Sequence, residues 1–348
     1  MSRMSARAQA RAPTRTLTDE WMLGRLRVPN RVLLAPLAGI GNWFVRLQAK
    51  RYGAGMAFSE MVSSHAIHYG NEKTHRELLR IDARERETGP TSIQLFGEDP
   101  AMLRSAAAHV ARIGADAIDI NMGCPVTKVC KTGAGAALLD DPKRAVALAK
   151  AAGRGSGLPV TVKLRSGQGP GDLRGLEVAR RLAAEGAVEA IAIHPRHASQ
   201  RHKGTPDYVL ARELVQELPV PVLVSGGLNT AEQARAAFEL TGAAGVLMAR
   251  GSLGNPWVFE QLLGRREIDP EPAEILDELD WVIERAIAHL GAERASRYLR
   301  KFYPWYVERL GRSYTESAGG PKALQAALQT ASTLDEARAL FRGVAVTA

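Results

Sequence analysis

The sequence predicts an α/β protein, a (β/α)8 TIM barrel followed by a smaller all-α C-terminal domain. From residue 31 to about residue 250, short β-rich runs alternate with longer Ala-, Leu- and Arg-rich segments typical of helices. After Trp257 the strand-like runs stop, and the rest of the chain reads as successive helices. The alternative, a doubly wound dinucleotide-binding sheet, would have a Gly-x-Gly-x-x-Gly turn after an early strand, and the sequence has none.

Eight segments have the length and composition of buried strands. They are residues 31–35, 56–59, 91–95, 117–121, 160–164, 190–194, 221–225 and 245–249. The helices predicted between them include 100–113, 142–152, 173–185, 208–217 and 231–240. Eight strand–helix units within about 220 residues fit a closed barrel better than an open sheet.

The chain divides into three predicted parts. Residues 1–18 form an Ala-, Arg- and Ser-rich basic tail whose arginines precede the first acidic residue, Asp19, and which lacks the apolar segment of a secretory signal. It resembles a weak organellar transit peptide, but we expect a disordered extension. Residues 19–262 are predicted to form the barrel and to hold the catalytic site. Residues 263–348 are predicted to form the helical domain.

Composition narrows the class of protein. Of the 348 residues, 45% are hydrophobic and 24% charged, as in a soluble enzyme, and no apolar run is long enough to span a membrane. The two cysteines, Cys124 and Cys130, cannot form a disulfide framework and lack the partner ligands of a zinc site. We therefore expect no metal and a reducing cytoplasm. The net charge of +9 favours a polyanionic partner such as nucleic acid, and the alternative is that the charge serves general solubility.

The most informative motif is Asn121-Met122-Gly123-Cys124-Pro125, where a predicted strand ends in a thiol held on a stiff turn. Barrel enzymes place their functional residues at the C-terminal ends of strands, so Cys124 lies where chemistry is expected. The alternative is a cysteine that only packs in the core. The polar Asn121 and Lys128, one helical turn beyond, favour catalysis.

Two glycine turns predict a phosphorylated ligand. Ser225-Gly226-Gly227 and Ala249-Arg250-Gly251 follow the last two strands, where barrels of this kind often bind phosphate through backbone N–H groups. The first strand ends in Ala35-Pro36-Leu37-Ala38-Gly39, a turn whose backbone can contact a flat ring.

Three further strand ends suit a flavin ring. Gln94 can bond its pyrimidine edge, and Lys163 can stabilise the negative charge of the reduced ring, with His194 nearby. Lys163 is alternatively a Schiff-base lysine. The adjacent Arg165, on the same side of the strand, and the lack of a carboxylate relay favour the flavin.

The predicted helical domain has a basic, aromatic segment. Arg294, Arg297 and Lys301 are spaced to share one helix face, with aromatic residues between them. This face either contacts RNA or is a solvated surface over an aromatic core. Pro304 is expected to kink or end the helix.

These residues resemble the tRNA-dihydrouridine synthase family, in particular its bacterial B type. The matching stretches are 35–39, 92–97, 119–125 with 128–129, 161–165, 251–257, and Arg300-Lys301 with Trp305-Tyr306. The resemblance implies a barrel that holds FMN, a helical domain that binds tRNA, and NADPH-linked reduction of particular uridines to 5,6-dihydrouridine. We expect a cytoplasmic monomer.

The resemblance also implies roles for individual residues. Cys124 would be the acid that protonates C5 of uracil while reduced FMN passes hydride to C6. The implied FMN contacts are Pro36, Leu37, Ala38, Gln94, Lys163, His194, Ser225, Gly226, Gly227, Ala249 and Arg250. The implied RNA contacts are Asn121, Lys128, Arg165, Arg297, Arg300 and Lys301.

The chain departs from the family pattern at two loops, and other functions stay open. It has Ser225-Gly226-Gly227 where the family commonly has Asn-Gly-Asp, and His194-Pro195-Arg196-His197 where the family often has His-Gly-Arg-Thr. His197 and His202 are candidates for the flavin phosphate or for RNA. The alternatives are a flavin oxidoreductase that acts on a small pyrimidine, resembling dihydroorotate dehydrogenase, and a non-catalytic RNA-binding protein.

Overall fold

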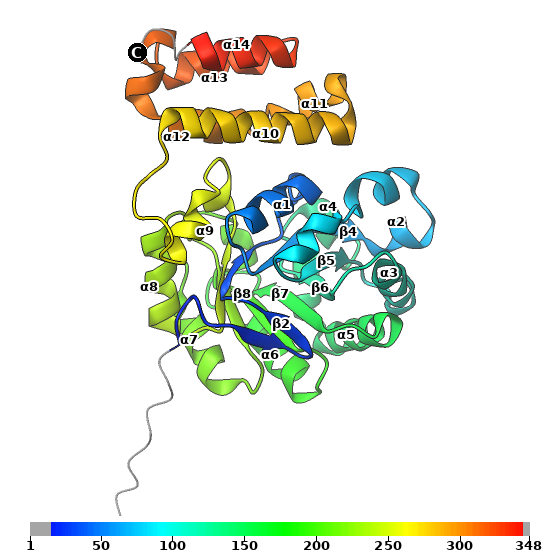
Figure 1. Ribbon diagram of the computed structural model, residues 1–348. Coiled ribbons are helices and arrows are strands. Elements are labelled where there is room, and N and C mark those ends of the chain that lie inside the picture. Colours follow the sequence, from blue (N-terminus) through cyan, green and yellow to red (C-terminus); the bar gives the residue numbers. More distant parts are fainter. Residues whose placement is uncertain (1–14, 344–348) are drawn as a thin grey trace, which may run out of the picture.

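The predicted barrel is present in the computed structural model, which describes residues 15–343 (Figure 1). Its eight parallel strands close in the order β10-β3-β4-β5-β6-β7-β8-β9. They are β3 (Val32–Leu34), β4 (Met56–Ser63), β5 (Thr91–Phe96), β6 (Ala117–Met122), β7 (Val160–Arg165), β8 (Ala190–His194), β9 (Val222–Ser225) and β10 (Gly245–Met248). Each corresponds to one predicted strand. β4 is four residues longer than predicted, and its pairing with β5 shifts register between Phe58 and Met61.

Helices surround the barrel and continue beyond it. Those of the barrel are α1 (Trp43–Arg51), α2 (Ser64–His68), α3 (Pro100–Arg112), α4 (Thr127–Cys130), α5 (Pro142–Ser156), α6 (Arg174–Ala184), α7 (Tyr208–Glu217), α8 (Ala231–Thr241) and α9 (Trp257–Leu262). Capping residues in the sequence determine where several of these helices begin. Asp99 and Asp141 accept bonds from the first-turn N–H groups of α3 and α5, and each helix begins with proline.

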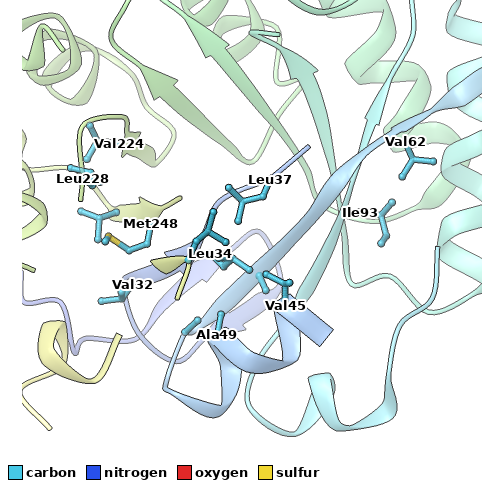
Figure 2. Close-up of a cluster of buried hydrophobic side chains, with 14 of the residues drawn as sticks. Val32, Leu34, Leu37, Val45, Ala49, Val62, Ile93, Val224, Leu228 and Met248 are labelled. Carbon is cyan, nitrogen blue, oxygen red and sulfur yellow. The ribbon is translucent and has the colours of Figure 1, made fainter. Parts of the chain in front are cut away.

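Strand alternation decides which residues face the cavity of the barrel. On β6, Ile118 and Ile120 point outward into the layer between sheet and helices, whereas Ala117, Asp119 and Asn121 point inward. Figure 2 shows part of the outer layer, where side chains of β3 such as Leu34 pack near α1. The inward positions change from apolar at the N-terminal end to polar at the C-terminal end.

A hairpin that was not predicted from the sequence fills the N-terminal end of the barrel. It consists of β1 (Trp21–Leu23) and β2 (Leu26–Val28), paired antiparallel. Its apolar side chains pack against inward residues such as Met56, and the Trp21 indole N–H donates to the Asn30 carbonyl at 3.1 Å. The hairpin leaves the opposite end of the barrel for the site. Of the predicted tail, residues 1–14 lie outside the described range, and Leu17 is buried.

The C-terminal helices form a layer over one side of the barrel (Figure 1). They are α10 (Pro272–Leu290), α11 (Ala292–Leu299), α12 (Tyr303–Thr315), α13 (Pro321–Thr330) and α14 (Leu334–Gly343). A buried carboxylate joins the layers. Glu278 of α10 accepts from the Gln48 amide at 2.9 Å and from the Tyr52 hydroxyl at 2.7 Å, both on or beside α1. One continuous apolar cluster spans barrel and helices.

The prediction that Arg294, Arg297 and Lys301 share one helix face is wrong, because α11 ends at Leu299 and Lys301 lies in the following turn. Arg294 instead pairs with Glu77 of the barrel at 2.8 Å, and the Lys301 ammonium donates to the Gly39 carbonyl at 3.2 Å. A helix break does occur in this segment, but α11 ends at Leu299, before the proline, and Pro304 lies in the first turn of α12. Of the helices in residues 15–343, none is long and apolar enough to cross a membrane.

Candidate active site

A cavity of about 660 Å³ lies at the C-terminal ends of the barrel strands. It is lined by every residue that the resemblance assigned to FMN: Pro36, Leu37, Ala38, Gln94, Lys163, His194, Ser225, Gly226, Gly227, Ala249 and Arg250. Cys124, Asn121, Lys128 and Arg165 line it too. Its lining within the described chain includes no aspartate or glutamate, whereas Arg196 and Arg201 add to the cations above. The cavity therefore favours an anionic ligand.

Asn121 shapes the turn that presents Cys124 to the cavity. Its side-chain oxygen accepts from the backbone N–H of Gly123 at 3.2 Å and of Cys124 at 2.9 Å. This bonding of an asparagine to its own following backbone is the local arrangement that stabilises tight turns. Gly135 closes the other side, since its φ is +63° and a Cβ there would lie 2.7 Å from the Cys124 carbonyl.

The Cys124 thiol is held in its protonated form. It is partly buried, and burial raises the pKa of the Cys124 thiol above its ordinary value, with a smaller opposing effect from the Arg165 guanidinium. An unperturbed thiol with a pKa of about 8.5 is already mostly protonated at neutral pH. A protonated thiol can donate a proton, whereas a nucleophilic cysteine reacts as the thiolate.

A buried carboxylate below the cavity, to which the sequence pattern assigned no role, orients the Gln94 amide. Asp119 is fully buried and accepts from Gln94 Nε2 at 2.6 Å and from Thr161 Oγ1 at 2.5 Å. Gln94 Oε1 in turn accepts from the Asn121 amide at 2.9 Å. Burial raises the pKa of Asp119 to about 6. The sequence could have predicted this role, because Asp119 lies two residues before Asn121 on β6 and therefore points inward as Asn121 does.

Lys163 supplies a cation to the cavity. Burial lowers the pKa of Lys163 to about 8, and the positive charge of Arg165 adds to the shift. Because that value lies above 7, the protonated form of the lysine predominates at neutral pH. Its ammonium has no hydrogen-bond partner recorded among residues 15–343, and it lines the cavity. A charged, unpartnered ammonium suits an anionic ligand better than Schiff-base formation.

His194 is a neutral ring packed on a glycine. Its Nε2 lies 3.1 Å from Arg196 Nη1, and because arginine only donates, Nε2 accepts and the proton is on Nδ1. Burial and the surrounding cations lower the pKa of His194. Gly226 has φ +92°, and a Cβ there would lie 2.3 Å from the ring. The ring position thus requires glycine at 226.

The two glycines and Arg196 form a cradle that fits a phosphate. Both Gly226 and Gly227 have positive φ, and the Gly226 carbonyl accepts from the Tyr208 hydroxyl at 2.5 Å. The Arg196 Nε is buried with no partner, although Nη2 donates to the Gly204 carbonyl at 2.6 Å. An anionic group bound here would satisfy that orphaned donor.

Arg165 does not extend into solvent as an RNA contact would. It is 3% exposed, and its guanidinium donates to the backbone carbonyls of Gly123 at 2.9 Å, Arg201 at 2.8 Å and His197 at 3.2 Å. The buried end of β7 places it between the Cys124 turn and the loop after β8. Arg165 therefore joins these two loops.

The C-terminal basic residues are not part of the cavity lining, although Lys301 bonds to Gly39 beside it. Arg297 pairs with Glu293 on the surface, and Arg300 donates to the Ala331 carbonyl at 2.9 Å. Arg300 therefore holds helices of its own domain together. Lys301 and these two arginines are not part of the cavity lining, whereas Trp305 of α12 is.

Trp305 reaches the cavity because a glycine lets α12 approach the barrel. Gly254, in the loop after β10, has φ +62°, and a Cβ there would lie 2.8 Å from the Trp305 backbone. In the sequence analysis Trp305 belongs to the C-terminal stretch that resembles the family, but no contact with the cavity is assigned to it. The sequence signal that could have indicated this contact is that the Gly251–Trp257 loop and the stretch containing Trp305 both belong to the resemblance.

A parallel eight-stranded barrel with a cationic cavity and a protonated thiol at its mouth defines a TIM-barrel enzyme. Residues 33–338 match the family described as dihydrouridine synthase (Dus). The chain belongs to this family of flavin-dependent oxidoreductases.

Curated relatives match over most of their length. The tRNA-dihydrouridine synthase B of Pseudomonas aeruginosa is 36% identical over 299 residues, covering 83% of this chain and 87% of that protein. The tRNA-dihydrouridine synthase B of Xanthomonas axonopodis is 33% identical, and the match covers 92% of this chain and 97% of that protein. A probable tRNA-dihydrouridine synthase of Rhodobacter capsulatus is 36% identical, covering 90% and 98%.

Solved structures share the barrel at much lower identity. A mutant morphinone reductase in complex with tetrahydroNAD superposes with a TM-score of 0.55 at 15% identity, covering 75% of this chain and 94% of that one. Histamine dehydrogenase from Rhizobium superposes with a TM-score of 0.54 at 14% identity, covering 72% of this chain and 48% of that one. These similarities show the fold alone.

Proposed function

We propose that this protein is an FMN-dependent tRNA-dihydrouridine synthase that reduces particular uridines of tRNA to 5,6-dihydrouridine with NADPH. The observation that carries the proposal is the placement of the protonated Cys124 thiol at the mouth of a cation-lined cavity. Family membership and the names of the relatives support the substrate.

The residues present fit FMN. Gly226, Gly227 and Arg250, with the unpaired Arg196 Nε, would hold its phosphate. Gln94, Lys163 and His194 would hold the ring edge, and the backbone of residues 36–38 would lie against the ring. When bound, the flavin supplies the hydride that uracil C6 accepts.

Cys124 supplies the other hydrogen. Once C6 has gained a hydride, the ring carries negative charge toward C5, and the thiol gives C5 its proton to complete the reduced C5–C6 bond. The resulting thiolate is reprotonated from solvent through the open cavity mouth. Asn121 and Arg165 hold the turn that presents the thiol.

The uracil must leave the folded tRNA to reach this site. Extruding a base costs a few kcal/mol, which contacts to the RNA backbone offset. The exposed Lys128 at the cavity rim is a candidate for such a contact, as are Arg297 and Lys301 of the helical domain. We assign residues 263–348 to tRNA binding and expect a cytoplasmic monomer.

The test is a purified-protein assay. The protein is expected to carry oxidised-flavin absorbance, to yield FMN on denaturation, and to form dihydrouridine in unmodified tRNA when NADPH is added. Dihydrouridine mapped in tRNA from cells that lack the protein identifies the position. Reduction of free pyrimidines instead would favour the small-substrate alternative, and a colourless protein that binds tRNA but no FMN would favour a non-catalytic role.

The pH dependence tests the proton-donor role of Cys124. A donor is active in its protonated form, so its rate falls as pH rises through its pKa. Because burial raises the pKa of the Cys124 thiol, we expect single-turnover dihydrouridine formation to be constant from about pH 6 to about pH 8.5, the ordinary thiol value, and to fall above it. Flavin reduction by NADPH is followed in parallel as the control. A rate that rises across about pH 7–9 would assign the thiolate as the active form.

A further inference from the structure

A second cavity lies directly beside the first. This groove, which we call the Lys131 groove, has a volume of about 560 Å³ and includes Thr127, Lys131, Gln168 and Arg201 in its lining. Thr127, Arg201 and Pro125 line both cavities. The two cavities therefore adjoin each other at the turn that carries Cys124.

The chemistry of the Lys131 groove suits a phosphodiester. Lys131 and Arg201 are both exposed, and no salt bridge is recorded for either within residues 15–343. Hydroxyl and amide groups and the Cys130 thiol make up the rest of its polar lining, and no carboxylate of the described chain belongs to it. Two free cations beside neutral hydrogen-bonding groups form a surface that attracts phosphate.

Arg201 is held between the cavities by its backbone. It has φ +53°, the one positive φ outside glycine among the described residues. Such a conformation persists only where surrounding contacts enforce it. Here the enforcing contact is Arg165, whose Nη1 donates to the Arg201 carbonyl at 2.8 Å while its Nε donates to the Gly123 carbonyl at 2.9 Å. The residue that fixes Arg201 therefore also fixes the Cys124 turn.

We propose that the Lys131 groove binds the RNA backbone next to the extruded uridine, with Lys131 and Arg201 each contacting a phosphate. This inference rests on the proposed function. A base that swings into the main cavity leaves its own backbone and the adjoining phosphates at the cavity mouth. The groove is the cationic surface that adjoins the main cavity at the Cys124 turn.

The first experiment counts phosphate contacts. The dissociation constant of flavin-loaded protein for unmodified tRNA is measured from about 50 to 300 mM salt, where the slope of log Kd against log salt changes by about 0.7–0.9 per phosphate contact. We expect Lys131→Ala and Arg201→Ala each to reduce the slope by about that amount, and Arg201→Lys to restore it. The control is Arg212→Ala, which removes an exposed cation of α7. Unchanged slopes in both alanine variants would overturn the inference.

The second experiment locates the contact on the RNA. A methylphosphonate removes one phosphate charge beside the uridine that the enzyme reduces. It is expected to weaken binding by the wild type and to have little further effect on Lys131→Ala or on Arg201→Ala. Equal weakening of the wild type and both variants would overturn the inference. Wild-type protein that forms dihydrouridine while these tests fail would refute the groove alone, whereas wild type that forms none would refute the proposed function.

Discussion

Replacing Cys124 with alanine is expected to lower the rate of dihydrouridine formation by about 10²- to 10⁴-fold, the usual contribution of a positioned general acid. In the proposed mechanism this thiol, which lines the cavity, is the proton donor, and burial raises the pKa of Cys124 above its ordinary value. The substitution removes no cation from the cavity. Flavin content and the rate of flavin reduction by NADPH should therefore stay unchanged, and both are measured beside single-turnover reduction of unmodified tRNA.

Cys130→Ala is the matched control for this prediction. Cys130 carries the same chemical group six residues later, but its Sγ donates to the Cys124 carbonyl at 3.2 Å and it is not part of the main cavity lining. Its loss is expected to leave dihydrouridine formation within a few-fold of wild type. Near-normal activity of Cys124→Ala would remove Cys124 from the acid role.

The barrel could be predicted because its signal is repeated. Each strand is a short apolar run followed by a polar turn, and eight repeats exclude most other folds. The β1–β2 hairpin gave no comparable signal, because two three-residue strands are too short to show alternation. The register shift in β4 likewise depends on its neighbour β5 and not on its own sequence.

The strand-end part of the site was also predictable. Parallel barrel strands bring their C-terminal ends to one rim, so Gln94, Lys163 and His194 must lie together if the strand assignments hold. The hydrogen-bond partners of these polar side chains could not be predicted from the sequence. Arg165 has the residue type of an RNA contact, yet its guanidinium donates to three loop carbonyls whose positions depend on the folded loops.

Contacts between the two layers were the least predictable. Trp305 reaches the cavity only because α12 docks on the loop that contains Gly254. Arg294, Arg297 and Lys301 have the spacing of one helix face, but spacing alone cannot show that α11 ends at Leu299, before Lys301. Docking of one helix layer on another is set by side-chain packing over long sequence separations, which a local pattern does not encode.

Gly226→Ala is expected to yield protein without bound flavin. A Cβ at 226 would lie 2.3 Å from the His194 ring, which is buried and hydrogen-bonded to Arg196 and so has little room to move. Overlap of this kind costs about 1–3 kcal/mol, and the positive φ adds about 1–2 kcal/mol for any residue with a Cβ. The protein can relieve this overlap only by displacing the turn after β9, which is the turn that would hold the FMN phosphate.

The matched control separates the clash from the backbone effect. Gly186 has φ +58°, but no atom lies within 4 Å of the position that a Cβ would occupy there, so Gly186→Ala carries only the backbone cost. We expect Gly186→Ala to retain flavin at the wild-type ratio, and Gly226→Ala to retain less than about a tenth of it while keeping the wild-type circular dichroism spectrum, because the turn lies at the rim of an otherwise intact barrel. Full flavin content in Gly226→Ala would show that the cofactor is held elsewhere. Equal loss in both variants would show that the barrel responds to backbone strain and not to the cradle formed by Gly226 and His194.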